Sequence, residues 1–316
     1  EICPDAWVIN LSNPMAVCMD VLYKTFPKIK AVGCSNEPLY SQELIADFVS
    51  QETDGKSISR REIKTNLVGI NGFSWFTEAA YQGEDVMGIF KKNTERYSLS
   101  GYEKHPGEYK ANPFASANMV KFDMFLRYGA IAAAADRNIA DFCPPWYVKT
   151  PKIACAWKLG MISVNYLKKR RNERLLRSKK LMTGEEYLKV GSSKNDCVNI
   201  IKALIGISNI ITNGALPNNG QISNLPVGAV VQTNCLFSQN SVKPVMSGEL
   251  PDELCSLTLR HVYNQKTLVK SVLEKDLDIA FNAFLNDPLV TSDLASSTEL
   301  FKEMLAGIRA HLVYYC

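Results

Sequence analysis

The beginning of the chain alternates between short apolar runs and segments with helical spacing. Apolar residues dominate 7–11 and 29–34, whereas 15–26 and 41–51 place their apolar residues at helical intervals. Strands that alternate with helices in this way are typical of a parallel sheet. Functional residues in such sheets lie just beyond the carboxyl ends of the strands. We therefore expect an α/β fold with polar functional residues at that edge.

The rest of the chain mixes strands and helices less regularly. The pattern predicts strands at 64–68 and 228–237 and helices at 116–128 and 197–210, the last with Asp196 as its N-cap. The residues after these elements look largely helical. No internal repeat or low-complexity segment interrupts the pattern, so we expect packed domains rather than a repeat array.

Composition places the chain among globular proteins. Its 316 residues are 46% hydrophobic and 22% charged, which is enough apolar surface for a core and excludes wholesale disorder. We expect no membrane-spanning helix and no secretory signal, since no apolar run is long enough and no basic segment precedes one. The net charge of +4 is too small to indicate a nucleic-acid partner.

The positive charge is concentrated in one segment. Lysine and arginine dominate the stretch from Lys168 to Lys180, where only Glu173 opposes them. Read as a helix, the segment has a partial apolar stripe that includes Leu167 and Leu175. It is either a solvated surface helix or a patch that binds an anion or a partner.

Cysteine and histidine give no local signal for a metal site. The chain has nine cysteines, none in Cys-x-x-Cys spacing, and three histidines that lie far apart in sequence. Structural zinc sites usually cluster these residues. We expect free thiols in a reducing cytoplasm.

The glycines also lack a dinucleotide-binding pattern. No two of the 18 glycines are separated by a single residue, so a Gly-x-Gly-x-x-Gly turn is absent from this sequence. Either the fold never bound a dinucleotide, or the sequence begins after the half of the domain that does.

Short motifs follow one another in a fixed order along nearly the whole chain. They include Trp7-Val8-Ile9-Asn10, Ser12-Asn13-Pro14, Ala31-Val32-Gly33-Cys34, Gly69-Ile70-Asn71, Asp136-Arg137, Asn224-Leu225-Pro226, Gly248-Glu249-Leu250-Pro251 and Asn286-Asp287-Pro288-Leu289-Val290. In this order and spacing they resemble the family 4 glycoside hydrolases, and within that family the alpha-galacturonidase-like branch.

The resemblance implies a hydrolase of O-glycosyl bonds that depends on NAD and on Mn²⁺. In this family a hydride leaves the sugar C3 for NAD, the metal polarises the resulting ketone, the C2 proton is removed and the leaving group is eliminated. The resemblance further implies a small glycoside substrate such as a galacturonide or an alpha-glucoside, a cytoplasmic location and a homo-oligomer. Neither a nucleic acid nor a membrane partner is implied.

The resemblance also implies a fold with two parts. Residues 1–40 would be the end of a Rossmann domain, and 41–316 an α+β substrate domain similar to the C-terminal domain of lactate and malate dehydrogenases. In the family the phosphate-binding turn precedes the Asn-Pro motif, which would explain the missing glycine pattern.

Four residues are candidates for direct roles. Asn13 would hydrogen-bond the substrate near the nicotinamide, or would form a turn before Pro14. Asn71 belongs to a family motif and would contact the substrate. Arg137 would pair with a sugar carboxylate or form a structural ion pair, and Asp136 would be an acid or base or a cap and salt-bridge partner.

The sequence departs from the family at the metal site. The family ligands are a Cys and a His, but the corresponding positions here hold Ser35 and Gly72, and a one-residue shift would turn Cys34 to the other face of the chain. Asn36 and Asn138 replace two further histidines. A hydroxyl and a hydrogen atom are poor substitutes for a thiolate and an imidazole, so we expect impaired metal binding.

Two main hypotheses follow. The chain is a family 4 glycosidase by descent, with impaired activity, or it is a non-catalytic relative that keeps the fold to bind a sugar or a partner. A 2-hydroxy-acid dehydrogenase would also suit Ser12-Asn13-Pro14, but it needs a catalytic histidine within 69–74, where none occurs.

Overall fold

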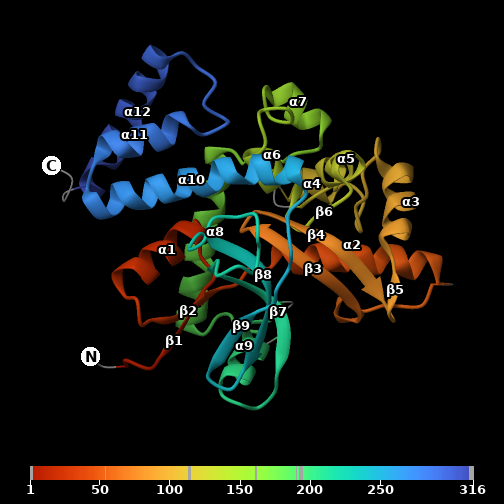
Figure 1. Ribbon diagram of the computed structural model, residues 1–316. Coiled ribbons are helices and arrows are strands. Elements are labelled where there is room, and N and C mark those ends of the chain that lie inside the picture. Colours follow the sequence, from red (N-terminus) through yellow and green to blue (C-terminus); the bar gives the residue numbers. More distant parts are fainter. Residues whose placement is uncertain are drawn as a thin grey trace.

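The computed structural model of the chain describes residues 3–53, 55–112, 115–160, 162–189, 191 and 195–312. Its first sheet has the order β1-β2-β7-β8-β9. Strands β1 (Trp7–Asn10) and β2 (Lys30–Gly33) pair in parallel, as the alternating pattern predicts. Strands β7 (Ile210–Pro217), β8 (Val230–Ser238) and β9 (Ser241–Pro244) extend it in antiparallel fashion. The parallel arrangement is therefore limited to the first pair, and the chain returns to this sheet much later in the sequence (Figure 1).

The second sheet is built on a long hairpin. Strands β3 (Ile63–Ile70) and β4 (Phe73–Tyr81) are joined by the two residues Asn71 and Gly72. Asn-Gly is a favoured two-residue hairpin turn, and Gly72 has a φ of +82°, which other residues rarely adopt. Short strands β5 (Glu84–Asp85) and β6 (Ile131–Ala132) both pair with β4.

Helices cover both sheets. They are α1 (Met15–Thr25), α2 (Glu37–Glu52), α3 (Met87–Tyr97), α4 (Glu108–Ala111), α5 (Met119–Tyr128), α6 (Asp136–Phe142), α7 (Pro151–Ala156), α8 (Val164–Thr183), α9 (Cys197–Leu204), α10 (Asp252–Glu274), α11 (Leu277–Leu285) and α12 (Leu294–Ile308), with 3-10 turns at Arg60–Glu62 and Arg309–His311. In Figure 1 the long helix α10 runs from the region of α6 toward α1, and α11 and α12 follow it at the C-terminal end.

The hairpin of β3 and β4 is buried on both faces, which fixes the position of its turn. Val68 and Trp75 belong to a core cluster shared with α5, α6 and α10. Leu67 and Phe76 face the opposite way, into a cluster with α2 and α3. Successive side chains of a strand point to opposite faces, so one hairpin serves two cores.

Two predicted helix boundaries were wrong. The helix predicted at 41–51 begins at Glu37, because Pro38 is accommodated in its first turn. The helix predicted at 197–210 ends at Leu204, because Gly206 takes a φ of +86° and Ile210 already pairs with β8. Asp196 lies at the expected N-cap position, but its side chain makes no capping hydrogen bond.

The basic segment forms helix α8, and no side chain in that helix is buried. The helix is thus exposed, as both interpretations require, and the binding of an anion or a partner there stays a prediction. Within the residues that the structure describes, no helix is long and apolar enough to cross a membrane.

Candidate functional site

Segments far apart in the sequence meet at the ends of β1, β2 and β3. Asn13 follows β1, and Asn71 lies in the turn after β3. The Asn71 amide donates a hydrogen bond from Nδ2 to Asn13 Oδ1 over 3.1 Å. The Asn138 amide, at the start of α6, donates to the Glu37 carboxylate at the start of α2. A Cβ atom on Gly72 would lie 3.9 Å from Asn138 Nδ2, which joins the two pairs into one cluster.

Ser35 is held by its neighbours in a way that suits a structural role. Its backbone N–H donates to Asn213 Oδ1 over 3.0 Å, and Asn213 Nδ2 donates to its carbonyl over 2.9 Å. Its hydroxyl accepts the backbone N–H of Glu37 over 3.3 Å. The adjacent Cys34 is buried, and burial raises the pKa of its thiol, so the thiolate that a metal requires is disfavoured.

Gly72 offers neither a ligand nor the space for one. A Cβ built at this position would lie 3.1 Å from Cε2 of Phe142, closer than most real contacts of this kind. The Phe142 ring stacks on the Phe73 ring with the centroids 5.5 Å apart, and this packing restrains its position. A side chain at this position would therefore require a small shift of the Phe142 ring.

These residues do not fit the Cys and His metal site of the family. Ser35 provides a hydroxyl already engaged in the first turn of α2, and Gly72 provides no donor. Over the described residues, no group of three or more His, Cys, Asp and Glu side chains is arranged to hold a metal ion.

Asp136 is fully enclosed, with 2% of its surface exposed. Its Oδ1 accepts the backbone N–H of Lys121 over 3.0 Å at the start of α5, while Oδ2 has no hydrogen-bond partner. Burial raises the pKa of Asp136, although the Lys121 charge opposes the shift. The structure thus shows the capping role, and a role as acid or base stays a prediction.

Glu37 and Lys121 are part of this cluster; Glu37 lies in the polar run after the second strand, where functional residues are expected, whereas Lys121 did not stand out in the sequence. Burial raises the pKa of Glu37 to about 7 against the opposing charge of Lys121, and its Oε2 has no hydrogen-bond partner. The Lys121 ammonium donates to Ser41 Oγ over 2.6 Å, and burial lowers its pKa to about 8. The signal was the helical spacing of Lys121 to Met124 and Phe125, which places it on the apolar face of α5.

Arg137 points away from the cluster. Its Nη1 donates to the carbonyl of Gly160 over 3.2 Å, and its Nε lies 4.0 Å from Asp141. It lines a separate cavity of about 630 Å³ together with Lys149 and Leu289. The structural contacts are thus present, and pairing with a sugar carboxylate stays a prediction.

Two family models match successive parts of the chain. The model described as family 4 glycosyl hydrolase matches residues 1–51, and that of the family 4 glycosyl hydrolase C-terminal domain matches 67–290. The chain belongs to family 4 of the glycosyl hydrolases. The resemblance seen in the motifs is therefore confirmed.

Relatives with 40% identity or more are named alpha-galacturonidases. The chain is 46% identical over 314 residues to an alpha-galacturonidase of Thermoanaerobacterium saccharolyticum, which covers 99% of this chain and 68% of that protein. It is 40% identical to an alpha-galacturonidase of Bacillus subtilis, over 98% of this chain and 68% of that one.

Solved structures agree on the fold. The crystal structure of the B. subtilis glucosidase candidate lplD superposes with a TM-score of 0.91 at 41% identity, over 96% of this chain and 69% of that one. A 6-phospho-alpha-glucosidase from gut microorganisms, crystallised with NAD and Mn²⁺, gives a TM-score of 0.74 at 17% identity, over 97% of this chain and 67% of that one. The expected α/β fold of the family is confirmed.

Proposed function

We propose that this protein binds an alpha-galacturonide and that the metal-dependent hydrolysis of its relatives is impaired in this chain. The similarity to alpha-galacturonidases supports the substrate class. The residues at the two ligand positions carry the second part, because Ser35 offers only a hydroxyl and Gly72 offers no side chain.

The amides of Asn13 and Asn71 are the groups best suited to bind the sugar. Asn13 is exposed, and it shares one hydrogen bond with Asn71. The Asn71 Oδ1 atom has no hydrogen-bond partner, although it is buried. An unpaired buried acceptor costs about 1–3 kcal/mol, and a sugar hydroxyl that donates to it recovers this free energy.

NAD would accept the hydride and Mn²⁺ would polarise the ketone where both bind. The side chains here can hydrogen-bond and orient a sugar. Burial raises the pKa of Asp136, so its buried carboxyl can carry a proton close to the bound sugar.

Sugar binding is tested by calorimetry with galacturonic acid. We expect saturable binding to the wild-type protein and at least roughly tenfold weaker binding to Asn71→Ala, the effect of losing one buried hydrogen bond. The matched control is Asn172→Ala, an exposed residue on helix α8, which has no buried side chain. Binding that is equal in both variants would contradict the assignment of Asn71.

Metal dependence is tested separately by electron paramagnetic resonance of Mn²⁺ and by hydrolysis of an aryl alpha-galacturonide with NAD. The B. subtilis alpha-galacturonidase is the comparator. We expect Mn²⁺ affinity and turnover at least roughly 100-fold below the comparator, since altered ligand surroundings alone cost 10- to 100-fold. Turnover within tenfold of the comparator, with a stoichiometric Mn²⁺ signal, would show an active glycosidase and overturn the proposal.

A further inference from the structure

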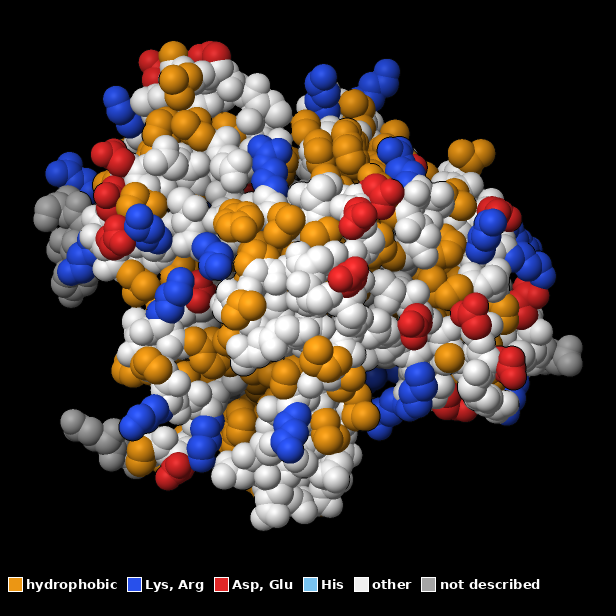
Figure 2. Space-filling view, in the orientation of Figure 1, with side chains coloured by type: hydrophobic (Ala, Val, Ile, Leu, Met, Phe, Trp, Pro, Cys, Tyr) orange, Lys and Arg blue, Asp and Glu red, His pale blue; other side chains and the backbone are white. Residues whose placement is uncertain are grey.

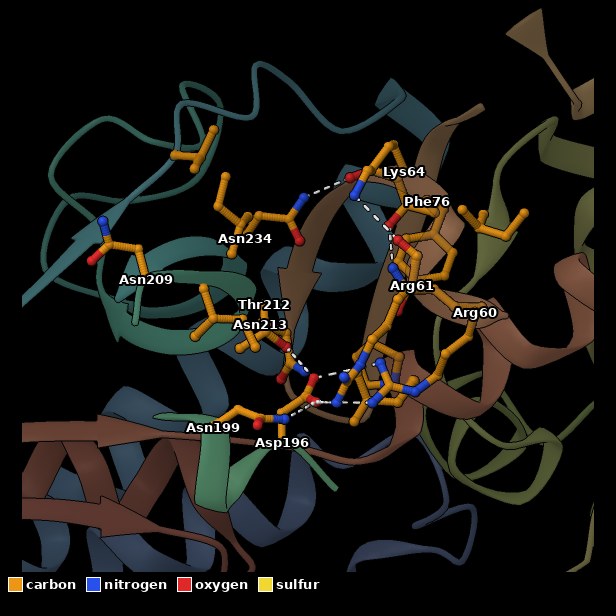
Figure 3. Close-up of a pocket in the computed structure, with 18 of the residues that line it drawn as sticks. Arg60, Arg61, Lys64, Phe76, Asp196, Asn199, Asn209, Thr212, Asn213 and Asn234 are labelled. Carbon is orange, nitrogen blue, oxygen red and sulfur yellow. Dashed lines mark hydrogen bonds and ion pairs between the residues drawn. The ribbon is translucent and has the colours of Figure 1, made fainter. Parts of the chain in front are cut away.

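A cavity of about 700 Å³ lies outside the cluster described above, between the start of β3 and the sheet of β7 and β8. In Figure 3 Asp196 and Asn199 face Arg60 and Arg61 across its lower part, and Lys64 and Asn234 lie at its upper part. The surface view shows basic side chains at the indentation between the lobe of β7 to β9 and the lobe of β3 to β5 (Figure 2).

The single carboxylate of this cavity is already saturated. Asp196 is 5% exposed and receives Arg60 Nη2 at 2.9 Å and Nη1 at 3.4 Å, together with the Thr212 hydroxyl at 2.9 Å. Burial would raise the pKa of Asp196, but the hydrogen bonds and charge of Arg60 outweigh it and hold the pKa below its usual range. This carboxylate remains ionised and orients Arg60.

Two further cations remain at the rim. The Arg61 side chain is 60% exposed, and its one contact with Asp196 is long, at 3.4 Å. The exposed Lys64 ammonium donates only to the carbonyl of Arg61, over 3.1 Å, among the residues described. Three cationic side chains therefore line the cavity against one carboxylate, which leaves an excess of two positive charges.

The remaining lining combines amides with an apolar wall. Asn209 is exposed at the cavity and can donate or accept hydrogen bonds, and Asn234 is fixed by its 2.5 Å bond to the carbonyl of Thr65. Ile211 and Val245 also line the cavity, and their side chains are 64% and 37% exposed. A fork of guanidinium donors beside amides and apolar surface matches an anionic group on a small organic body.

The cavity also touches the candidate site. Asn213 lines the cavity and holds the backbone of Ser35 on both sides through its amide. A molecule seated here would therefore contact the residue that fixes the loop after β2.

We propose that this cavity is a binding site for a small organic anion that carries a phosphate or carboxylate group. Arg61 and Lys64 bind the anionic group, Arg60 is fixed behind them by Asp196, and Ile211 and Val245 contact the organic body. This proposal does not depend on the proposed binding of a galacturonide.

The test uses calorimetry at low salt with phenyl phosphate, phenylmalonate and uncharged benzyl alcohol. The first two probes distinguish a phosphate from a carboxylate ligand, and the third reports the apolar wall alone. The variant is Arg61→Gln with Lys64→Gln, which leaves the Arg60–Asp196 pair intact. The control is Lys91→Gln with Lys270→Gln, which removes the same net charge from side chains that are 65% and 59% exposed on other helices.

We expect saturable binding of at least one anion and no binding of benzyl alcohol. In the Arg61 and Lys64 variant, anion binding should be more than roughly tenfold weaker, since the loss of one charge-assisted hydrogen bond alone gives about this factor and the variant removes two donors. The control should bind as the wild type does, and circular dichroism should show that both variants are folded. Equal weakening in both double variants would indicate a nonspecific charge effect and overturn the proposal. The proposal would also be overturned if no anion binds saturably to the wild-type protein, or if anion binding is lost in Asn71→Ala.

Discussion

Two clusters in this molecule bury carboxyl groups near a cation, and the pKa values of these carboxyl groups shift in opposite directions. In the first, Asp196 lies beside Arg60, and the pKa of the carboxyl is lowered. In the second, Asp136 and Glu37 lie near Lys121, and both carboxyl pKa values are raised. Burial favours the neutral acid in both clusters, so the proximity of a cation does not decide the outcome.

The difference lies in the hydrogen bonds. Both oxygens of Asp196 accept bonds, and two of these come from the planar fork of Arg60. Lys121 instead donates to Ser41, and one oxygen of each of the two carboxyls in its cluster has no partner. A cation that makes no hydrogen bond to a carboxylate does not compensate for the carboxylate's loss of hydration, whereas direct hydrogen-bond donors do. The first cluster is built as a fixed ion pair and the second as a site with spare acceptors.

The largest effect should come from removing the cation of the second cluster. We expect Lys121→Met to lower the free energy of unfolding at pH 7 by about 3 kcal/mol, because it leaves two buried carboxyls without a nearby cation and Ser41 without its donor. Urea denaturation followed by circular dichroism measures the change.

Lys104→Met is the control for this substitution. It breaks the Lys104–Asp47 pair of 3.0 Å, in which the lysine side chain is 64% exposed, and such pairs contribute about 1 kcal/mol or less. Equal losses in the two variants would show that Lys121 contributes no more than a surface charge, and the contrast between the clusters would then not hold.

The sequence predicted the fold better than the surroundings of the candidate residues. The folded chain brings Asn13, Asn71 and Asn138 close together, although β1 and β3 belong to different sheets and Asn138 lies on α6. Lys121 was missed because its counter-charges come from α2 and α6, which only the folded chain brings close. Arg137 could not be assigned either, since consecutive residues of a helix point in different directions.

A smaller effect is expected for the ion pair itself. Asp196→Asn should cost about 2 kcal/mol at pH 7, because the mostly buried Arg60 loses its charged acceptor. The pKa of Asp196 is depressed in the folded protein, so its stabilisation is present above the unfolded pKa of about 4 and is lost as pH falls through the folded value. Urea denaturation of both proteins at pH 7 and pH 3 should show a difference that shrinks at the lower pH. A difference that stays constant would mean that the carboxylate charge is not the stabilising factor.

The smallest effect has the opposite sign and sharpens the contrast most. The pKa of Glu37 is about 7 in the folded protein, above its unfolded value of about 4.3, so its stabilisation is present below pH 4.3 and is lost as pH rises toward 7. Glu37→Gln keeps an acceptor for Asn138 and removes this titration. Relative to wild type, the variant should therefore gain about 1 kcal/mol in free energy of unfolding between pH 6 and pH 7. Glu84→Gln, at an exposed strand end, should show no such gain. If Glu37→Gln instead loses stability as pH rises, Glu37 is an ion-pair partner like Asp196, and the two clusters follow the same rule.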